Sequence, residues 1–400
     1  MAHKQKVLIV GGGFGGVKAA LGLVDDTRFD VTLLSEDPDL RYYPTLYHTA
    51  TGGRRSNSSI PLTRIFTDKT ITLAQGTAAI LDRKAKTVST SDGTAYAYDI
   101  LILGLGVVTN YFGIQGMQEF SYSIKSQSEV ARFKAHLHKQ LLDTGKPDPH
   151  YVVVGAGPTG IELAGALPSY LRHIMKMHGL PARAVHVDLI EAAPRLLPRL
   201  PKDTSRTVRR RLNRLGVKLY IGKTVQGATA DALTVSGKPI RSHTVIWTAG
   251  VTNNPFFTAN NFVIMGRGKV GVNAYLESED GIYVIGDNAN TPYSGLAQTA
   301  LRDGAFVAKN LRRLASGKKP LSYSVKAPIT VIPAGPHWAA VLWGSVSIHG
   351  FIGWLLREAA DIVGFRDLEP WKRASKQFLS EFAVEDDCKT CTAAAQTTVQ

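Results

Sequence analysis

Two glycine-rich segments carry residues whose type and spacing suit close contact with phosphate groups. They comprise Gly11, Gly13 and Gly16 in the first segment and Gly155, Gly157 and Gly160 in the second. In each, the first glycine permits a tight turn, the second lets the backbone approach a pyrophosphate, and the third brings a helix close to a strand. The N-terminus of a helix that starts at such a turn also favours phosphate charge. The sequence therefore predicts two dinucleotide sites in one chain.

Carboxylates follow both turns where a ribose would meet them. Glu191 ends the second strand of the second unit, where it would accept a hydrogen bond from a ribose 2′-hydroxyl and repel a 2′-phosphate. NADH is therefore expected in preference to NADPH. Glu36 occupies the corresponding place in the first unit and would hold a ribose there, although Ser35 directly follows the apolar run.

Two further acidic residues lie near the expected cofactors. Glu162 follows Thr159 and Gly160 just inside a helix, where it would either stabilise the helix N-terminus or lie near a nicotinamide. Asp287 follows Gly286 and would hydrogen-bond the ribityl chain of a flavin or serve only as a turn residue. Two stacked cofactors transfer a hydride without a protein nucleophile, so flavin chemistry is the simplest expectation.

The chain repeats one order of elements around the two turns. Residues 6–34 and 150–191 each read as strand, glycine turn, helix and strand, and further buried strands are expected at 98–106, 243–250 and 281–287. Short apolar runs that lead into glycine and a helical period are typical of strands buried on both faces of a parallel sheet. The pattern predicts an α/β fold with two Rossmann-like dinucleotide-binding domains.

The strand order predicts that the second unit is inserted into the first. The first nucleotide domain is expected to comprise 1–115 and 260–325, the inserted domain 116–259, and a C-terminal region 326–400. A chain of 400 residues that is 44% hydrophobic is large enough to bury two such cores.

The formal charge of +15 is compatible with nucleic acid, an anionic membrane surface or anionic cofactors. One arginine cluster lacks the interleaved aromatic residues that stack on bases, which favours a solvated helix face over nucleic-acid binding. The cluster comprises Arg206, Arg209, Arg210, Arg211 and Arg214. No secretory signal is recognisable at the N-terminus, so a cytosolic location is expected.

The only cysteines, Cys388 and Cys391, lie in a tail that is expected to be mobile. They exclude a disulfide framework that would hold the fold together. Two ligands alone do not make a zinc site, and no metal is expected.

Residues 347–365 are predicted to form a helix that lies on a membrane surface and does not cross the bilayer. Arg357, Glu358 and Asp361 leave an uncharged run shorter than the roughly 20 residues that a span requires. Helical spacing relates the apolar residues Ile352, Leu355, Leu356, Ala359, Ile362 and Val363, with Trp354 and Trp371 as interfacial anchors. A helix that closes the core or a dimer interface explains the pattern equally well.

The chain resembles the type II NADH dehydrogenases, single-subunit NADH:quinone oxidoreductases with the flavin disulfide reductase-like fold. The resemblance spans essentially residues 5–365 and rests on VLIVGGGFGG, PTLYHTATG, YDILILGLGVVTNYFGIQG, VVVGAGPTGIELAGAL, TVIWTAGV and YVIGDNA. It implies FAD in the first domain, NADH in the second, and hydride transfer from NADH to the flavin. The electrons would then reduce a membrane quinone, ubiquinone or menaquinone. A homodimer bound peripherally to the cytoplasmic face of the cell membrane is expected.

The same resemblance assigns residues to each site. FAD would be held by Gly11, Gly13, Phe14, Gly15, Gly16, Gly286 and Asp287. NADH would be held by Gly155, Gly157, Thr159, Gly160, Glu162, Glu191, Ala249 and Gly250. The flavin ring and quinone would meet Glu162, Ala297, Gln298, Arg302 and Lys326. A cation at Lys326 would stabilise the reduced flavin anion.

Arg302 departs from the family's quinone-site pattern, which has glutamine or glutamate at this position. Arg302 either polarises a quinone oxygen or pairs with Asp303 or Glu358 in a structural role. The C-terminal helix is more charged than the family's anchors, which indicates weak attachment.

The same residues bear on several alternative functions. Disulfide reductases and sulfide:quinone reductases require cysteines near the flavin and are excluded, because no cysteine precedes Cys388. An NADH oxidase or diaphorase with oxygen or a soluble acceptor stays open, as does a redox sensor that binds FAD and NADH without turnover.

Overall fold

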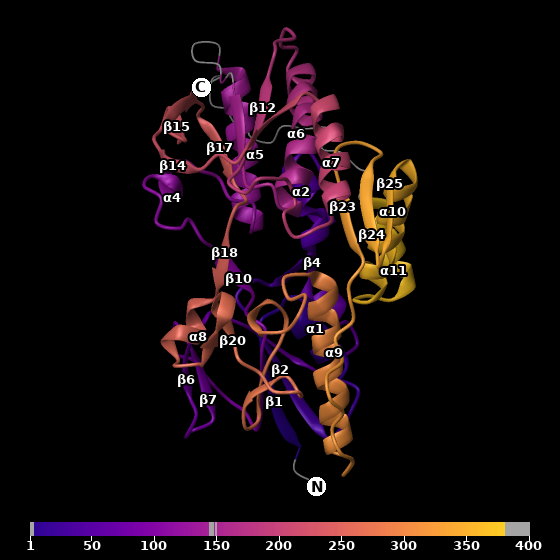
Figure 1. Cartoon of the computed structure of the whole chain (residues 1–400). Helices are drawn as coiled ribbons and strands as arrows, with labels where there is room; N and C mark the ends of the chain where they lie inside the picture. Colours follow the sequence, from indigo (N-terminus) through magenta and orange to yellow (C-terminus); the bar gives the residue numbers. More distant parts are fainter. Residues whose placement is uncertain (1–3, 144–147, 149, 381–400) are drawn as a thin grey trace, which may run out of the picture.

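The computed structural model describes residues 4–143, 148 and 150–380. Two lobes lie one above the other in Figure 1, with a smaller C-terminal unit beside them. The lobe that carries the N-terminus contains a six-stranded sheet in the order β21-β22-β9-β1-β2-β5. Its strands are β1 (Gln5–Val10), β2 (Phe29–Ser35), β5 (Thr72–Gln75), β9 (Ile100–Leu103), β21 (Glu277–Glu279) and β22 (Ile282–Val284). Neighbours pair in parallel except β21 and β22.

The second lobe is built on a parallel sheet in the order β13-β12-β11-β17. Its strands are β11 (His150–Val154), β12 (His186–Glu191), β13 (Val217–Ile221) and β17 (Thr244–Trp247). The chain then returns to the first sheet, where β22 pairs with β9. The expected fold class, with two Rossmann-like units, is confirmed, whereas the domain limits stay predictions.

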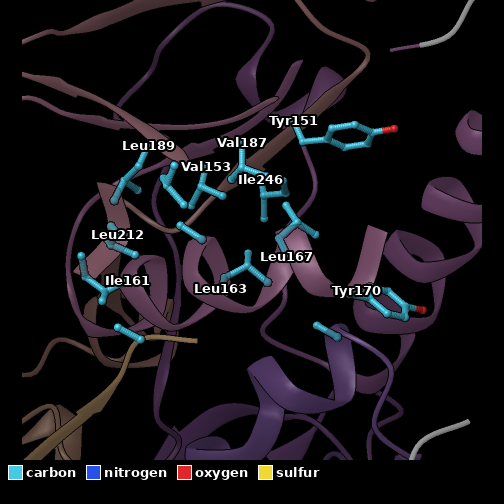
Figure 2. Packing of buried hydrophobic residues seen from close by; sticks show 14 of the residues in the cluster. Tyr151, Val153, Ile161, Leu163, Leu167, Tyr170, Val187, Leu189, Leu212 and Ile246 are labelled. Atoms are coloured by element: carbon cyan, nitrogen blue, oxygen red, sulfur yellow. The ribbon is translucent and has the colours of Figure 1, made fainter. Parts of the chain in front are cut away.

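Helices cover both sheets. The longer ones are α1 (Phe14–Leu21), α5 (Gln127–Leu142), α6 (Pro158–Met177), α7 (Lys202–Arg214) and α9 (Ala297–Leu314). Shorter ones include α2 (Leu46–Ala50), α3 (Leu62–Ile65), α4 (Met117–Phe120) and α8 (Pro255–Ala259). Figure 2 shows how apolar side chains of α6 and α7, including Leu167 and Leu212, pack against strand residues such as Val153 and Leu189.

The central strands are apolar on both faces because helices cover one side of each sheet and a small antiparallel sheet covers most of the other. Residues 7–10 of β1 expose at most 3% of their surface. This is why the sequence shows a continuous apolar run there instead of an alternating pattern.

Each lobe also contains small antiparallel sheets. They are formed by β3 (Asp39–Arg41) with β4 (Ser59–Pro61), by β6 (Ala78–Asp82), β7 (Thr87–Thr90) and β8 (Ala95–Ala97), and by β14 (Val225–Ala228), β15 (Ala232–Val235) and β16 (Lys238–Arg241). Two more pairs are β10 (Val107–Thr109) with β18 (Val251–Asn253) and β19 (Ile264–Met265) with β20 (Lys269–Val270). Figure 1 shows β10 and β18 where the two lobes meet.

The C-terminal unit departs from the predicted single helix. Three antiparallel strands come first, β23 (Thr330–Pro333), β24 (Ala339–Trp343) and β25 (Val346–Gly350), and two helices follow, α10 (Phe351–Arg366) and α11 (Trp371–Ser380). The prediction of helix over 347–350 is wrong, because these residues pair with β24 and Gly350 adopts φ +93° at the turn into α10. Within 4–143 and 150–380, no helix is both long and apolar enough to cross a membrane. Cys388, Cys391 and the predicted mobile tail lie outside the described residues.

Candidate active site

The first glycine turn leaves room for a cofactor at one position and is tightly packed at the others. The Gly11 N–H donates to the Leu34 carbonyl over 2.8 Å, which places the turn at the end of β2. A Cβ atom added to Gly16 would lie 2.0 Å from the Gly11 oxygen, so α1 approaches the turn closely. A Cβ atom on Gly13 would meet nothing within 4 Å. This open face at the start of α1 fits a pyrophosphate.

The second turn has the same construction. The Gly155 N–H donates to the Ile190 carbonyl over 2.8 Å, and a Cβ atom on Gly160 would lie 1.8 Å from the Gly155 oxygen. Gly157 faces open space, as Gly13 does. Thr159 is exposed in the first turn of α6. The structure therefore brings the predicted glycines of both sites into equivalent places at the carboxyl ends of two parallel sheets.

Ala249 and Gly250 lie beside the second turn, as the sequence predicts. A Cβ atom on Gly155 would lie 2.5 Å from the Ala249 Cα atom. A Cβ atom on Gly250 would lie 2.5 Å from the Phe112 ring. Gly155 and Gly250 therefore have no room for a side chain, and the Ala249 backbone lies directly against the turn.

Glu191 is directed at the second turn. Its Oε2 atom accepts a hydrogen bond from the Ala156 N–H over 2.7 Å, and its Oε1 atom accepts from the Ala193 N–H over 2.8 Å. Each carboxylate oxygen can accept further bonds, so a ribose contact is compatible with this geometry. Glu36 differs because it is exposed, and its backbone oxygen accepts from the Gln75 side chain over 3.3 Å. The ribose role of both residues stays a prediction.

The predicted ribityl contact lies at the start of a short turn after β22. Gly286 adopts φ +66°, and its N–H donates to the buried Asp303 carboxylate over 2.9 Å. Burial raises the pKa of Asp303 to about 6. Asp287 is partly buried and accepts from the Gly295 N–H over 2.9 Å through Oδ1. Asp287 is thus a turn residue that also keeps acceptor capacity for a ribityl hydroxyl.

Phe14 and Gly15, two further residues of the predicted FAD site, are tightly packed. A Cβ atom on Gly15 would lie 3.0 Å from Ile285 Cδ1, and Gly304 of α9 lies against the Gly15 oxygen. The Phe14 side chain is buried and meets the Tyr42 ring edge-on with centroids 5.5 Å apart. Phe14 therefore contributes its backbone to the turn and its ring to the core.

Gln298, Arg302 and Lys326, which the sequence assigned to the acceptor site, lie together. Arg302 Nη2 donates to Gln298 Oε1 over 3.3 Å, and Arg302 Nη1 donates to the Lys326 backbone oxygen over 2.8 Å. Ala297 begins α9, the helix that carries the first two. No ion pair joins Arg302 to Asp303 or Glu358 among the described residues, so the expected pairing is wrong. The choice between a structural and an acceptor role for Arg302 stays a prediction. The charge of Arg302 is held by neutral acceptors.

Glu162 lies among charged groups of α10. Burial raises the pKa of Glu162 to about 8, while the positive charge of Arg357 lowers it and the negative charge of Asp361 raises it. Burial likewise raises the pKa of the Tyr47 hydroxyl, on which Arg357, Glu162, Asp361 and Glu358 also act. Glu162 therefore holds a proton at neutral pH, which a helix-capping carboxylate would not.

The charged residues of α10 point inward. Arg357 and Asp361 expose 8% and 4% of their surface and form an ion pair of 2.7 Å. The Arg357 guanidinium lies 5.8 Å from the Tyr47 ring centroid, and the Tyr42 hydroxyl donates to Asp361 over 3.4 Å. The Tyr42 ring also stacks on Phe365 with centroids 4.2 Å apart. These contacts dock α10 against α2 and against Tyr42, which precedes it.

A cavity of about 610 Å³ lies between α2, α6, α10 and the segment from β23 to β24. Its lining includes Tyr47 and His48 of α2, Tyr170 of α6, and Trp354 and Arg357 of α10. Burial, followed by the charge of Arg357, lowers the pKa of His48 to about 4, so this imidazole is neutral. Tyr47 and Arg357 connect the cavity to the surroundings of Glu162.

The family follows from sequence comparison. Residues 5–304 match the family described as pyridine nucleotide-disulphide oxidoreductase. The chain belongs to this family. Type II NADH:quinone oxidoreductases of Staphylococcus saprophyticus and Staphylococcus aureus strain NCTC 8325 are 26% identical over 358 residues and 25% identical over 362 residues. Each alignment covers 84% of this chain and 88% of the relative. The resemblance to type II enzymes is confirmed.

Solved structures of the pyridine nucleotide-disulphide oxidoreductase fold agree with this chain over most of its length. NDH2 from Plasmodium falciparum in complex with NADH superposes with a TM-score of 0.83 at 16% identity, covering 95% of this chain and 98% of that chain. The sulfide:quinone oxidoreductase from Aquifex aeolicus superposes with a TM-score of 0.77 at 18% identity, covering 96% and 98%. These likenesses show a common fold.

Sequence reasoning missed the residues that connect the C-terminal helices to the site. Tyr47 and His48 were part of a recognised motif but received no role, and Arg357 and Asp361 were read only as charges that prevent a membrane span. Their spacing of four residues in an apolar helix was a usable signal, because such a pair shares one helix face. The partner face on α2 and α6 is visible only in three dimensions.

Proposed function

We propose that this chain is a non-proton-pumping, FAD-dependent NADH:quinone oxidoreductase of type II, which regenerates NAD in a respiratory chain. The observation that carries the proposal is the pair of equivalent glycine turns, each with an open position for a pyrophosphate, in a chain whose helix α10 exposes an apolar outer face. The named type II relatives support the same reaction.

The residues of this chain bind and orient the two cofactors and hold a proton. Gly13 and Gly157 leave room for the two pyrophosphates, and Asp287 and Glu191 offer carboxylate oxygens to the sugar hydroxyls. FAD, when bound, supplies a carrier that takes a hydride from NADH and passes electrons to a quinone. Burial keeps a proton on Glu162 at neutral pH.

A lipid-soluble acceptor reaches the cavity from the side of α10. Phe351, Ile352, Leu355 and Val363 expose 59%, 63%, 48% and 62% of their surface, an arrangement that is unfavourable in water and favourable in a bilayer interface. The Phe351 ring lies 5.3 Å from that of Trp354, which lines the cavity. The apolar surface and the cavity wall are therefore continuous.

Exposed Trp371 and Leu379 of α11 extend this apolar surface. The proposal includes peripheral attachment through α10 and α11 at the cytoplasmic membrane surface, a homodimer, and ubiquinone or menaquinone as acceptor. Sedimentation with vesicles and size-exclusion chromatography test the first two points.

Steady-state NADH oxidation tests the reaction. The purified, FAD-loaded chain is assayed with a ubiquinone analogue, a menaquinone analogue, oxygen and ferricyanide. Turnover with a quinone well above that with oxygen is expected. Turnover only with oxygen or ferricyanide would identify a diaphorase, and no turnover despite FAD and NADH binding would identify a sensor.

A further inference from the structure

Three titratable side chains form a hydrogen-bonded row from the surface to the cavity. The His138 Nδ1 and His178 Nε2 atoms lie 3.0 Å apart, and His138 Nε2 lies 3.4 Å from the Tyr170 hydroxyl. His138 belongs to α5, Tyr170 to α6, and His178 follows the last turn of α6. Tyr170 and His138 expose only 5% and 7% of their surface, whereas His178 is partly exposed.

The inner end of this row opens into the cavity. Tyr170 lines the space together with Tyr47, His48 and Arg357. Figure 2 shows Tyr170 at the edge of the apolar cluster, with its hydroxyl directed away from the leucine and valine side chains. Glu162 lies eight residues earlier in α6, about two turns away on the same side of the helix. The row therefore ends in the space where we place the acceptor.

Quinone reduction requires a proton that NADH does not supply. Conversion of a quinone to a quinol consumes two electrons and two protons. A hydride from NADH contributes two electrons and one proton, and the second proton must come from the solvent. Helix α10 forms the wall of the cavity that we place at the membrane, so the solvent proton enters from another side of the protein.

We propose that His178, His138 and Tyr170 form a relay that carries the solvent proton to the quinone in the cavity. This inference rests on the proposed quinone reduction. An imidazole can accept a proton at one nitrogen while it releases a proton from the other, and a phenol hydroxyl can do the same. A proton received by His178 moves to His138 Nδ1, the proton on His138 Nε2 moves to the Tyr170 oxygen, and Tyr170 releases its own toward the cavity.

The surroundings of His138 keep this imidazole neutral between turnovers. Burial, followed by the positive charges of His178, Lys134 and His173, lowers the pKa of His138 to about 4. A neutral imidazole passes a proton onward and does not trap it, because the charged form is unfavourable at this position.

Three variants test the relay. Tyr170→Phe keeps the ring and removes the hydroxyl, His138→Gln removes the central imidazole, and His178→Gln changes the partly exposed entrance. The matched control is His136→Gln on α5, since His136 bonds to Thr244 over 2.9 Å and does not line the cavity. Each variant is assayed with a quinone and with ferricyanide, which accepts electrons without protons, in water and in deuterium oxide.

We expect each relay variant to lower quinone turnover at least about tenfold, because positioned proton transfer contributes about a hundredfold or more to catalysis. Ferricyanide turnover, FAD content and thermal midpoint should stay near wild type, and the solvent isotope effect on quinone turnover should rise. Unchanged quinone turnover, or an equal loss with both acceptors, would overturn the relay alone. A wild-type protein that reduces ferricyanide but no quinone would overturn the proposed function and, with it, the relay.

Discussion

Replacing Glu162 with glutamine tests whether this carboxyl group supplies a proton during turnover. Burial raises the pKa of Glu162 from an ordinary value of 4.5 to about 8. At pH 7 about nine in ten molecules then carry the proton, and at pH 9 about one in ten do. If the protonated form is the active one, quinone turnover should fall about tenfold between pH 7 and pH 9.

The same pKa predicts a stability effect with a defined sign. A carboxyl group whose pKa is raised in the folded state opposes folding once the unfolded chain can ionise, so the penalty begins above pH 4.5 and stops growing above pH 8. It grows by about 1.4 kcal/mol for each pH unit in that window, to about 5 kcal/mol at most. Glu162→Gln should remove this penalty and gain stability relative to wild type as the pH rises.

The assay is NADH oxidation with a quinone from pH 6 to pH 9.5, with ferricyanide as the proton-independent control. Glu162→Gln should turn over more slowly and lose the decline between pH 7 and pH 9. Neighbouring charges should move the wild-type decline in opposite directions. Asp361→Asn should shift it to lower pH and Arg357→Met to higher pH, because these groups respectively raise and lower the pKa of Glu162. An unchanged decline in Glu162→Gln would refute the reasoning.

Three further changes probe other parts of the site. Gly160→Ala places a Cβ atom 1.8 Å from the Gly155 oxygen. The NADH concentration that half-saturates flavin reduction should therefore rise at least about tenfold, while FAD content stays normal. Equal NADH titrations of the variant and the wild type would contradict the second dinucleotide site. Arg302→Gln should raise quinone turnover relative to ferricyanide, and an identical ratio would leave Arg302 a structural role. Leu355→Glu should weaken vesicle binding about tenfold or more in a flotation assay, since a buried leucine contributes about 1.5–3 kcal/mol. The exposed Leu314→Glu on α9 is its control, and equal binding by both variants would exclude α10 as the anchor.

The sheets and their glycine turns could be predicted because their causes are local. Residues 7–10 form a continuous apolar run, and the glycine spacing that follows it is set by the geometry of one strand, one turn and one helix. The same reasoning applies to residues 150–160. The three-stranded sheet of the C-terminal unit was missed, because β25 is only five residues long and four of these were included in the predicted helix over 347–365.

The remaining parts of the site join residues that are distant in the sequence. Tyr42 and Asp361 are 319 positions apart, and His138 and His178 are 40 apart. No periodicity in one segment indicates such a contact. The partner of Arg302 could not be predicted from the sequence either. An ion pair with Asp303 or Glu358 was expected, whereas the guanidinium donates to the Lys326 backbone oxygen.

The orientation of α10 follows from which of its two faces has better partners. Helical spacing showed an apolar face and a charged face but did not indicate which one faces the protein. Buried charges are tolerated only when they are paired, and Arg357 has Asp361 at 2.7 Å, with the Tyr47 ring nearby. The charged face therefore docks on the lobes, and Phe351, Ile352, Leu355 and Val363 are left outside. Such an outer face needs an apolar cover, and a membrane provides one while placing a lipid-soluble acceptor beside Trp354 at the cavity wall.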